Sequence, residues 1–162
     1  MKQILLIVVG LSAFIFADFT KNGDIVTDTT MGLQWQDNTD TKTVKKSWIE
    51  AVDYCENLTL GGYSDWRLPN INEFKSIVDR SKSNPAIVDG FTNVRSDFYW
   101  SSTTTASASY DAWNVHFCYG NVTIHSKTHS YCVRCVRARQ VDDSIMMPIF
   151  SESKVLKGVV LY

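Results

Sequence analysis

Beyond its first 17 residues the chain lacks any apolar run long enough to cross a bilayer, so no later membrane span is predicted. It also lacks an excess of either charge, because 16 basic residues oppose 17 acidic ones for a formal net charge of −1. A nearly neutral chain has no overall field to attract nucleic acid or an anionic membrane, so we expect neither as a partner. The sequence has no internal repeat, no low-complexity tract and no Gly-X-Y pattern, which argues against a solenoid or a triple helix.

The N-terminus, MKQILLIVVGLSAFIFA, has the pattern of a secretory signal peptide. Lys2 supplies the positive charge, residues 4–16 are almost entirely apolar, and Ala17 is a small residue suited to the last position before cleavage. An uncleaved anchor is the alternative, whereas the absence of a cysteine just after Ala17 argues against a lipoprotein anchor. We therefore predict a signal peptide at residues 1–17 and an exported protein, either periplasmic or at the cell surface or secreted.

The rest of the chain is predicted to form one domain at residues 18–140, followed by an unassigned tail at residues 141–162. Apolar residues make up 44% of the sequence, which is enough to fill a core. The tail has no clear period, but its end carries a short apolar group that could add a strand to a partner. This group is Val155, Leu156, Val159, Val160 and Leu161.

Two helices are predicted, and alternating runs elsewhere indicate strands. The first helix is marked by apolar residues at helical spacing, namely Trp48, Val52, Cys55 and Leu58. The second begins after Asn70, which is placed to form a capping box with Glu73. Its apolar stripe is Ile71, Phe74, Ile77 and Val78.

A β-hairpin is predicted around Gly120 and Asn121, which suit a two-residue turn. In the preceding strand, AWNVHFC, apolar side chains alternate with polar ones. Trp113, Val115 and Phe117 are expected to face the core, and Asn114, His116 and Cys118 to face outward. With that turn, His116 would lie opposite His125, and Asn114 opposite Lys127.

Four cysteines in an exported chain are first interpreted as two disulfides. Side chains alternate along a strand, so Cys132 and Cys135 would project to opposite faces and would not bond to each other. Cys135 shares the inward face with Cys55, and Cys118 the outward face with Cys132, which predicts Cys55–Cys135 and Cys118–Cys132 bonds. A Cys132–Cys135 redox pair and a zinc site from three cysteines and a histidine are the alternatives.

The stretch GGYSDWRLPN links the two predicted helices, and its position favours a scaffold over a binding site. Gly61 or Gly62 can adopt the left-handed conformation that ends a helix. Trp66 and Leu68 are expected to fill core. The remaining residues of this structural signature are Asp65 and Arg67, expected to tie the loop down by hydrogen bonds, and Pro69, which blocks helix continuation before Asn70.

Several motifs occur in an order that resembles the C-terminal domain of the Legionella collagen-like adhesin (Lcl) family. They are MGLQWQD, GGYSDWRLPNINEF, YWSST, AWNVHF and RCVR. The resemblance implies an α+β, C-type-lectin-like fold, shared with formylglycine-generating enzymes, in which two helices pack on twisted antiparallel sheets. Such folds join the first helix to the last strand by a disulfide and often carry a second bond near the last strand, which agrees with the pairing predicted above.

The chain departs from the sugar-binding members of that fold. Calcium-dependent lectins carry a Glu-Pro-Asn or Gln-Pro-Asp loop and a Trp-Asn-Asp strand, whereas here Leu68 precedes Pro69, and Val115 follows Asn114. No acidic cluster offers the six or more oxygens that calcium prefers. We therefore expect no metal and no cofactor.

The sequence favours a non-enzymatic binding module that recognises a glycan, acidic polysaccharide included, or a protein partner. Its candidate ligand-binding residues are Tyr110, Asn114, His116, Tyr119, His125, Lys127, Arg134 and Arg137. An ordinary solvated sheet face is the plainer interpretation of these positions. The alternatives are an envelope assembly subunit that binds another exported protein and a formylglycine-generating-type metalloenzyme, although no set of nucleophile, base and orienting group is visible.

Overall fold

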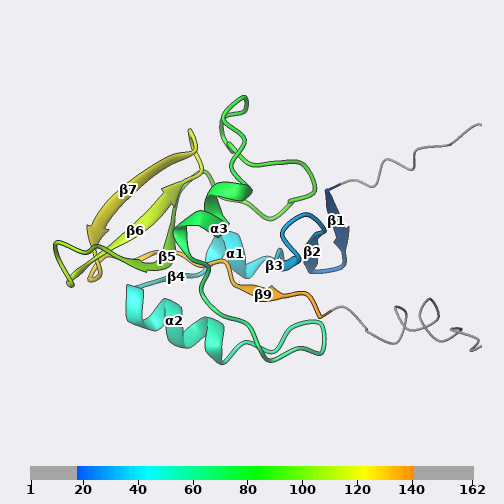
Figure 1. The fold of residues 1–162 in the computed structure, drawn as a ribbon, viewed down its shortest axis with the longest axis horizontal. Helices are drawn as coiled ribbons and strands as arrows, with labels where there is room; N and C mark the ends of the chain where they lie inside the picture. Colours follow the sequence, from blue (N-terminus) through cyan, green and yellow to red (C-terminus); the bar gives the residue numbers. More distant parts are fainter. Residues whose placement is uncertain (1–17, 141–162) are drawn as a thin grey trace, which may run out of the picture.

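The computed structural model describes residues 18–140, which fold into two β-sheets and three helices (Figure 1). The four-stranded sheet has the order β1-β2-β3-β9. Its strands are β1 (Phe19–Asn22), β2 (Ile25–Asp28), β3 (Leu33–Gln36) and β9 (Val136–Ala138). The α+β class predicted from the sequence is confirmed. The predicted signal peptide and the tail at residues 141–162 lie outside the described residues.

The five-stranded sheet has the order β4-β8-β5-β6-β7 and is antiparallel apart from the contact between β5 and β8. Its strands are β4 (Lys45–Lys46), β5 (Phe98–Thr104), β6 (Asp111–His116), β7 (Asn121–Ser126) and β8 (Tyr131–Cys132). The two sheets meet where the chain passes from β8 to β9 through three residues, Val133, Arg134 and Cys135.

Two of the helices match those predicted, and each begins with a capping box that satisfies free backbone N–H groups. In α2 (Trp48–Glu56) the box joins Ser47 to Glu50, and in α3 (Ile71–Ser76) it joins Asn70 to Glu73. The third helix, α1 (Asp40–Thr43), is a single turn that the sequence did not predict. None of the helices among residues 18–140 has the length and apolar character needed to span a membrane.

The core lies on both faces of the five-stranded sheet. On one face, α3 and the four-stranded sheet pack against Tyr99, Val115 and Phe117. On the other face, α2 covers Trp100 and Ala112. Figure 1 shows α2 beneath only part of the sheet, so the rest of that second face is not covered by a helix.

The GGYSDWRLPN stretch lies between α2 and α3 and contributes to both the core and the surface. Trp66 and Leu68 are almost fully buried. Asp65 accepts hydrogen bonds from Arg137, at 2.6 Å from Nε, and Arg67 donates to both carboxylate oxygens of Glu73 at 2.5 and 2.8 Å. Gly61 has a φ of 62°, and a Cβ there would collide with the side chain of Ile25. The positive φ therefore favours glycine at this position.

The alternation of side chains along the strands predicted one cysteine pair correctly and the other wrongly. Cys55 on α2 is bonded to Cys135, with 80 residues between them in sequence and a Cα–Cα distance of 5.5 Å. Cys118 and Cys132 are free, so the predicted second disulfide was wrong. Cys132 faces the core in the same cluster as Tyr99 rather than solvent, because residues 131–137 form two short strands and not the single continuous strand assumed for the alternation.

We expect the two free thiols to react at very different rates. Burial raises the pKa of the Cys132 thiol to about 11, so almost none of it is the reactive thiolate at pH 8. Cys118 is only half-buried. A thiol reagent should modify one cysteine in the native protein and two after denaturation without reductant. A Cys118–Cys132 peptide in a non-reducing digest would contradict this assignment.

Candidate functional site

The hairpin of β6 and β7 carries four of the predicted ligand-binding residues, Asn114, His116, Tyr119 and His125, but its register differs from the expected one. A four-residue turn, residues 117–120, joins the strands, and His116 lies opposite Asn121 instead of His125. The turn closes with a 2.9 Å hydrogen bond from the Gly120 N–H to the His116 carbonyl. Gly120 has a φ of 71°, and a Cβ there would lie 2.6 Å from Val78. The two-residue turn at Gly120 and Asn121 was therefore wrong, because tertiary packing decides the turn.

The observed register is shifted by four residues, an even number, so the predicted faces are retained. His125 lies opposite Ala112 and Asn114 opposite Thr123. Their side chains belong to the face of the five-stranded sheet that α2 covers only in part.

On the open part of this face, aromatic and histidine rings form a continuous cluster that we call the ring cluster. Its members are Phe98 on β5, His116 on β6, Tyr119 in the turn, His125 on β7, His129 in the following loop and Tyr131 on β8. Tyr119 and His129 are exposed, and the other four side chains are half-buried.

Each ring contacts the next one along a row that crosses the sheet. Phe98 stacks on His116 with ring centroids 4.1 Å apart and meets Tyr131 at 5.0 Å. At one end of the cluster, Tyr119 meets the edge of His116 at 6.4 Å. At the other end, His129 is parallel to Tyr131 at 5.8 Å. The cluster therefore presents amphipathic rings with apolar faces and polar edges.

Asn114 supports this cluster from below and is not itself exposed. The structure buries it completely, with its amide Nδ2 3.0 Å from His125 Nδ1 and its Oδ1 accepting from the Thr123 hydroxyl at 2.5 Å. Asn114 was predicted to contact a ligand, and its burial contradicts that role. Burial, followed by the charges of His129 and His116, lowers the pKa of His125, so its ring is neutral at pH 7.

Two other predicted ligand residues lie away from the ring cluster. Lys127 follows β7, donates to the Ser109 carbonyl at 2.7 Å and lies 4.0 Å above the Trp48 ring at the start of α2. Tyr110 is 70% exposed, and its carbonyl accepts from the Lys127 backbone N–H at 3.0 Å. The prediction that these two residues share a surface with His116 was therefore wrong.

The two predicted arginines are buried, which corrects the expected cationic surface. Arg134 is fully buried, donates to the carbonyls of Gln36 and Asn93 at 2.7 Å and pairs with Asp37 at 3.0 Å. Arg137 is 2% exposed and pairs with Asp65 at 2.6 Å. Both guanidinium groups are held by partners inside the domain, because an unpaired buried charge is very costly.

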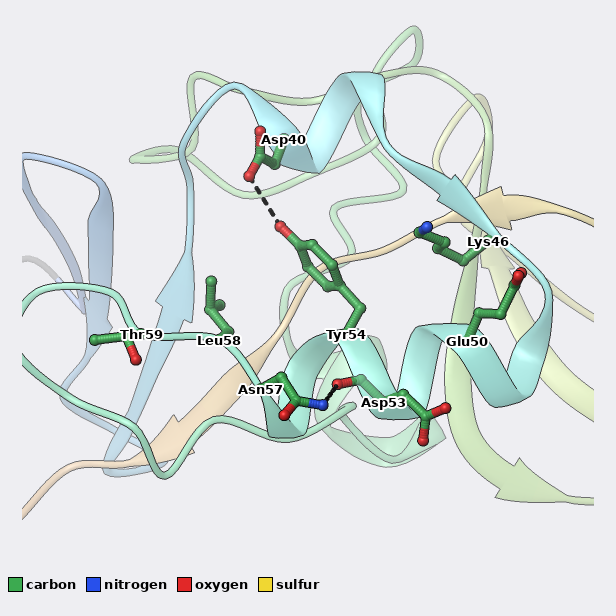
Figure 2. Close-up of a pocket in the computed structure, with 8 residues that line it drawn as sticks. All are labelled: Asp40, Lys46, Glu50, Asp53, Tyr54, Asn57, Leu58 and Thr59. Atoms are coloured by element: carbon green, nitrogen blue, oxygen red, sulfur yellow. Dashed lines mark hydrogen bonds between the residues drawn. The ribbon is translucent and has the colours of Figure 1, made fainter.

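The structure also has an open pocket along α2, which Figure 2 shows in close-up. It is lined by Asp40, Lys46, Glu50, Asp53, Tyr54, Asn57, Leu58 and Thr59. Tyr54 lies at its centre and donates a 3.0 Å hydrogen bond to Asp40 (Figure 2). Burial and the neighbouring Asp40 raise the pKa of Tyr54 to about 12, so the phenol keeps its proton.

Three carboxylates and one ammonium give this α2 pocket a net negative lining. Hydrogen bonds from Ser47 lower the pKa of Glu50, so that carboxyl is ionised at neutral pH. Such a lining repels acidic ligands and favours cationic ones. Within residues 18–140, no group of three or more His, Cys, Asp or Glu side chains is arranged to hold a metal ion. The alternative zinc site is also contradicted, because Cys135 is disulfide-bonded.

Sequence comparison identifies the family. A profile described as the Lcl C-terminal domain matches residues 24–137, and the chain belongs to that family. No curated protein matches the chain. The match spans the helices, both sheets apart from β1 and the final residue of β9, and every residue of the ring cluster.

Sequence reasoning missed Phe98, His129 and Tyr131 as neighbours of His116. Phe98 lies on the same face of β5 as the buried Trp100, so the alternation of side chains alone did not indicate that Phe98 would be at the surface. Tyr131 comes from β8, which adjoins β5 only through the single pair Tyr99 and Cys132. A contact between strands so far apart in the chain leaves no local sequence pattern from which it could be predicted.

Proposed function

We propose that the chain is an exported, non-enzymatic binding module that holds a glycan against the ring cluster. The observation that carries the proposal is the continuous, partly exposed row of six rings drawn from four strands and two loops. Rings of this type offer flat apolar surface to sugar rings, and their Tyr and His edges offer hydrogen bonds to sugar hydroxyls. Tyr119, which is 59% exposed at one end of the row, offers free ring surface to such a ligand.

The wider arrangement supports this proposal. One disulfide joins α2 to the segment that enters the last strand, as expected of a C-type-lectin-like fold, which we propose for this domain. The ring nitrogens of the three histidines in the cluster add polar contacts for a glycan, acidic polysaccharide included. The α2 pocket does not suit an acidic glycan, since its carboxylates repel it.

Titration of the purified chain against sulphated and neutral glycans at two salt concentrations tests the proposal. We expect Tyr119→Ala to weaken binding about five- to tenfold, corresponding to roughly 1–1.4 kcal/mol of lost ring contact. Any charge-dependent binding to the sulphated glycan should weaken at high salt.

Tyr110→Ala is the matched control, because Tyr110 is also a well-exposed tyrosine but lies outside the ring cluster. It should leave the affinity unchanged. Equal losses in the two tyrosine variants would place the ligand elsewhere, and failure to bind either class of glycan would sink the proposal.

A further inference from the structure

One carboxylate in the four-stranded sheet is buried although one of its two oxygens has no hydrogen-bond partner among the described residues. Asp28, the last residue of β2, is 1% exposed. Its Oδ1 accepts hydrogen bonds from the backbone N–H groups of Thr30 at 3.0 Å and Met31 at 2.9 Å. Its Oδ2 is buried and has no partner among the described residues. A buried carboxylate oxygen normally has a donor or a cation beside it, because leaving it unpaired is costly.

Asp28 lines a small pocket in which no fixed cation is available. The pocket is formed by Asp18, Phe19, Asp28, Thr30, Met31 and Ser76, with no Lys, Arg or His. Its two hydroxyls are engaged elsewhere: Ser76 donates to the Glu73 carbonyl at 2.7 Å, and Thr30 donates to Asp18 Oδ1 at 3.3 Å. The only titratable groups that line the pocket are the carboxyls of Asp18 and Asp28.

The backbone of Asp18 lies beside the end of the strand that carries this carboxylate, and both residues line the pocket. Phe19 is paired with Asp28 across β1 and β2, and the Thr29 N–H donates to the Asp18 carbonyl at 2.9 Å. Asp18 is therefore the residue that enters β1 next to the pocket. It is also the residue that follows Ala17, the predicted cleavage point.

We infer that the pocket receives the α-ammonium group of Asp18 once the chain is cleaved after Ala17, and that this ammonium forms an ion pair with Asp28. Hydrolysis adds one water across the peptide bond, so that Ala17 leaves with a carboxylate and Asp18 keeps an amine, which takes up a proton. An amide with one N–H is thereby replaced by a cation with three N–H donors. The inference rests on the export included in the proposed function and on the cleavage after Ala17 predicted from the sequence.

Comparison of three forms of the chain tests this pairing. The first begins at Asp18 with a free amine, the second is the same chain acetylated on that amine, and the third keeps a two-residue extension. At pH 6 we expect the Tm of the first form to exceed the other two by about 3 °C or more. The ion pair raises the pKa of the α-amine above its usual value of about 7.7–8.0. The advantage is therefore complete below that range and disappears as the pH rises through the raised pKa.

Asp28→Asn should abolish the difference between the free and acetylated forms, whereas Asp24→Asn, an exposed carboxylate in the same hairpin, should preserve it. Since Asp28→Asn could unfold the sheet, the acylation rate of the α-amine at pH 7 provides a second readout. We expect it to be about tenfold slower in the native chain than in the denatured one.

Equal Tm values for the free and acetylated forms, or unchanged amine reactivity, would overturn the inference. A fall in Tm of all three forms on chelation would assign the pocket to a metal cation instead and would also overturn it. The mass of the exported product shows separately whether cleavage falls after Ala17. Glycan titration of the free-amine form tests the proposed function independently of the pairing.

Discussion

Replacing Asp37 with asparagine lowers the free energy of unfolding by about 3–5 kcal/mol in urea titrations, because the substitution leaves the Arg134 guanidinium buried without its counter-charge. Both side chains are fully buried and lie 3.0 Å apart. Asp37 also accepts hydrogen bonds from Lys21 and from the backbone N–H groups of Thr92 and Asn93. Loss of the Asp37 carboxylate is therefore expected to loosen the loop of residues 92–93 and the segment between β8 and β9.

Acid should have the same effect as the substitution. Burial raises the pKa of Asp37, but the charge of Arg134 and hydrogen bonds from Lys21 and Thr92 outweigh burial, and the net pKa is lowered. A lowered pKa contributes stability that is present above the unfolded value of about 3.9 and is lost as the pH falls through the folded value. The stability of Asp37→Asn should accordingly depend less on pH in that acid range than that of the wild type.

Two further variants separate the ion pair from general damage. Asp89→Asn removes a carboxylate that is 99% exposed and pairs with Lys82, and it should leave stability nearly unchanged. Joint replacement of Asp37 by asparagine and Arg134 by methionine should cost less than the sum of the two single changes. Strict additivity would show that the two groups do not interact energetically.

Removal of the Cys55–Cys135 disulfide has an effect of similar size. The bond closes a loop with a sequence separation of 80, and the chain-entropy model gives such a loop roughly 4–5 kcal/mol. The double variant Cys55→Ala, Cys135→Ala should lose about that much free energy of unfolding. A midpoint measured by fluorescence of the five Trp residues in denaturant gives the value.

Cys118→Ser is the control for cysteine substitution as such. Its thiol is free, half-buried and 2.8 Å from the Asn84 side-chain oxygen, so its removal should cost much less than loss of the disulfide. Reductant should destabilise the wild type and leave the double variant unchanged. A double variant as stable as the wild type would mean that the crosslink contributes little beyond the packing around it.

The parts of the fold that could be predicted from the sequence are those with a local signal. Helical spacing located α2 and α3, and Asn70 with Glu73 marked the start of α3. The inward orientation of Cys55 and Cys135 followed from helix and strand periodicity and gave the observed disulfide. The same reasoning failed for Cys132, because residues 131–137 are not one strand but two short strands in different sheets.

The candidate site was less predictable, since its key contacts join distant residues. Arg134 and Arg137 were expected at the surface because arginine usually lies there. Their partners Asp37 and Asp65 precede them by 97 and 72 residues, and no pattern in one sequence reveals that pairing. The hairpin register depended on Gly120 packing against Val78, which is equally remote. The faces of His116 and His125 were nevertheless correct, because an even shift preserves alternation.

The passage of the chain between the two sheets has a consequence for the order in which the domain can form. The strands β1–β3, within residues 19–36, complete their sheet only by pairing with β9, about a hundred residues later. A chain that emerges N-terminus first therefore cannot close this sheet, form the Cys55–Cys135 bond or bury Arg134 until nearly the whole domain is available. Such long-range closure makes folding slow relative to a protein with local contacts. We therefore expect a nascent chain of this kind to complete its fold only after nearly the whole domain has been synthesised.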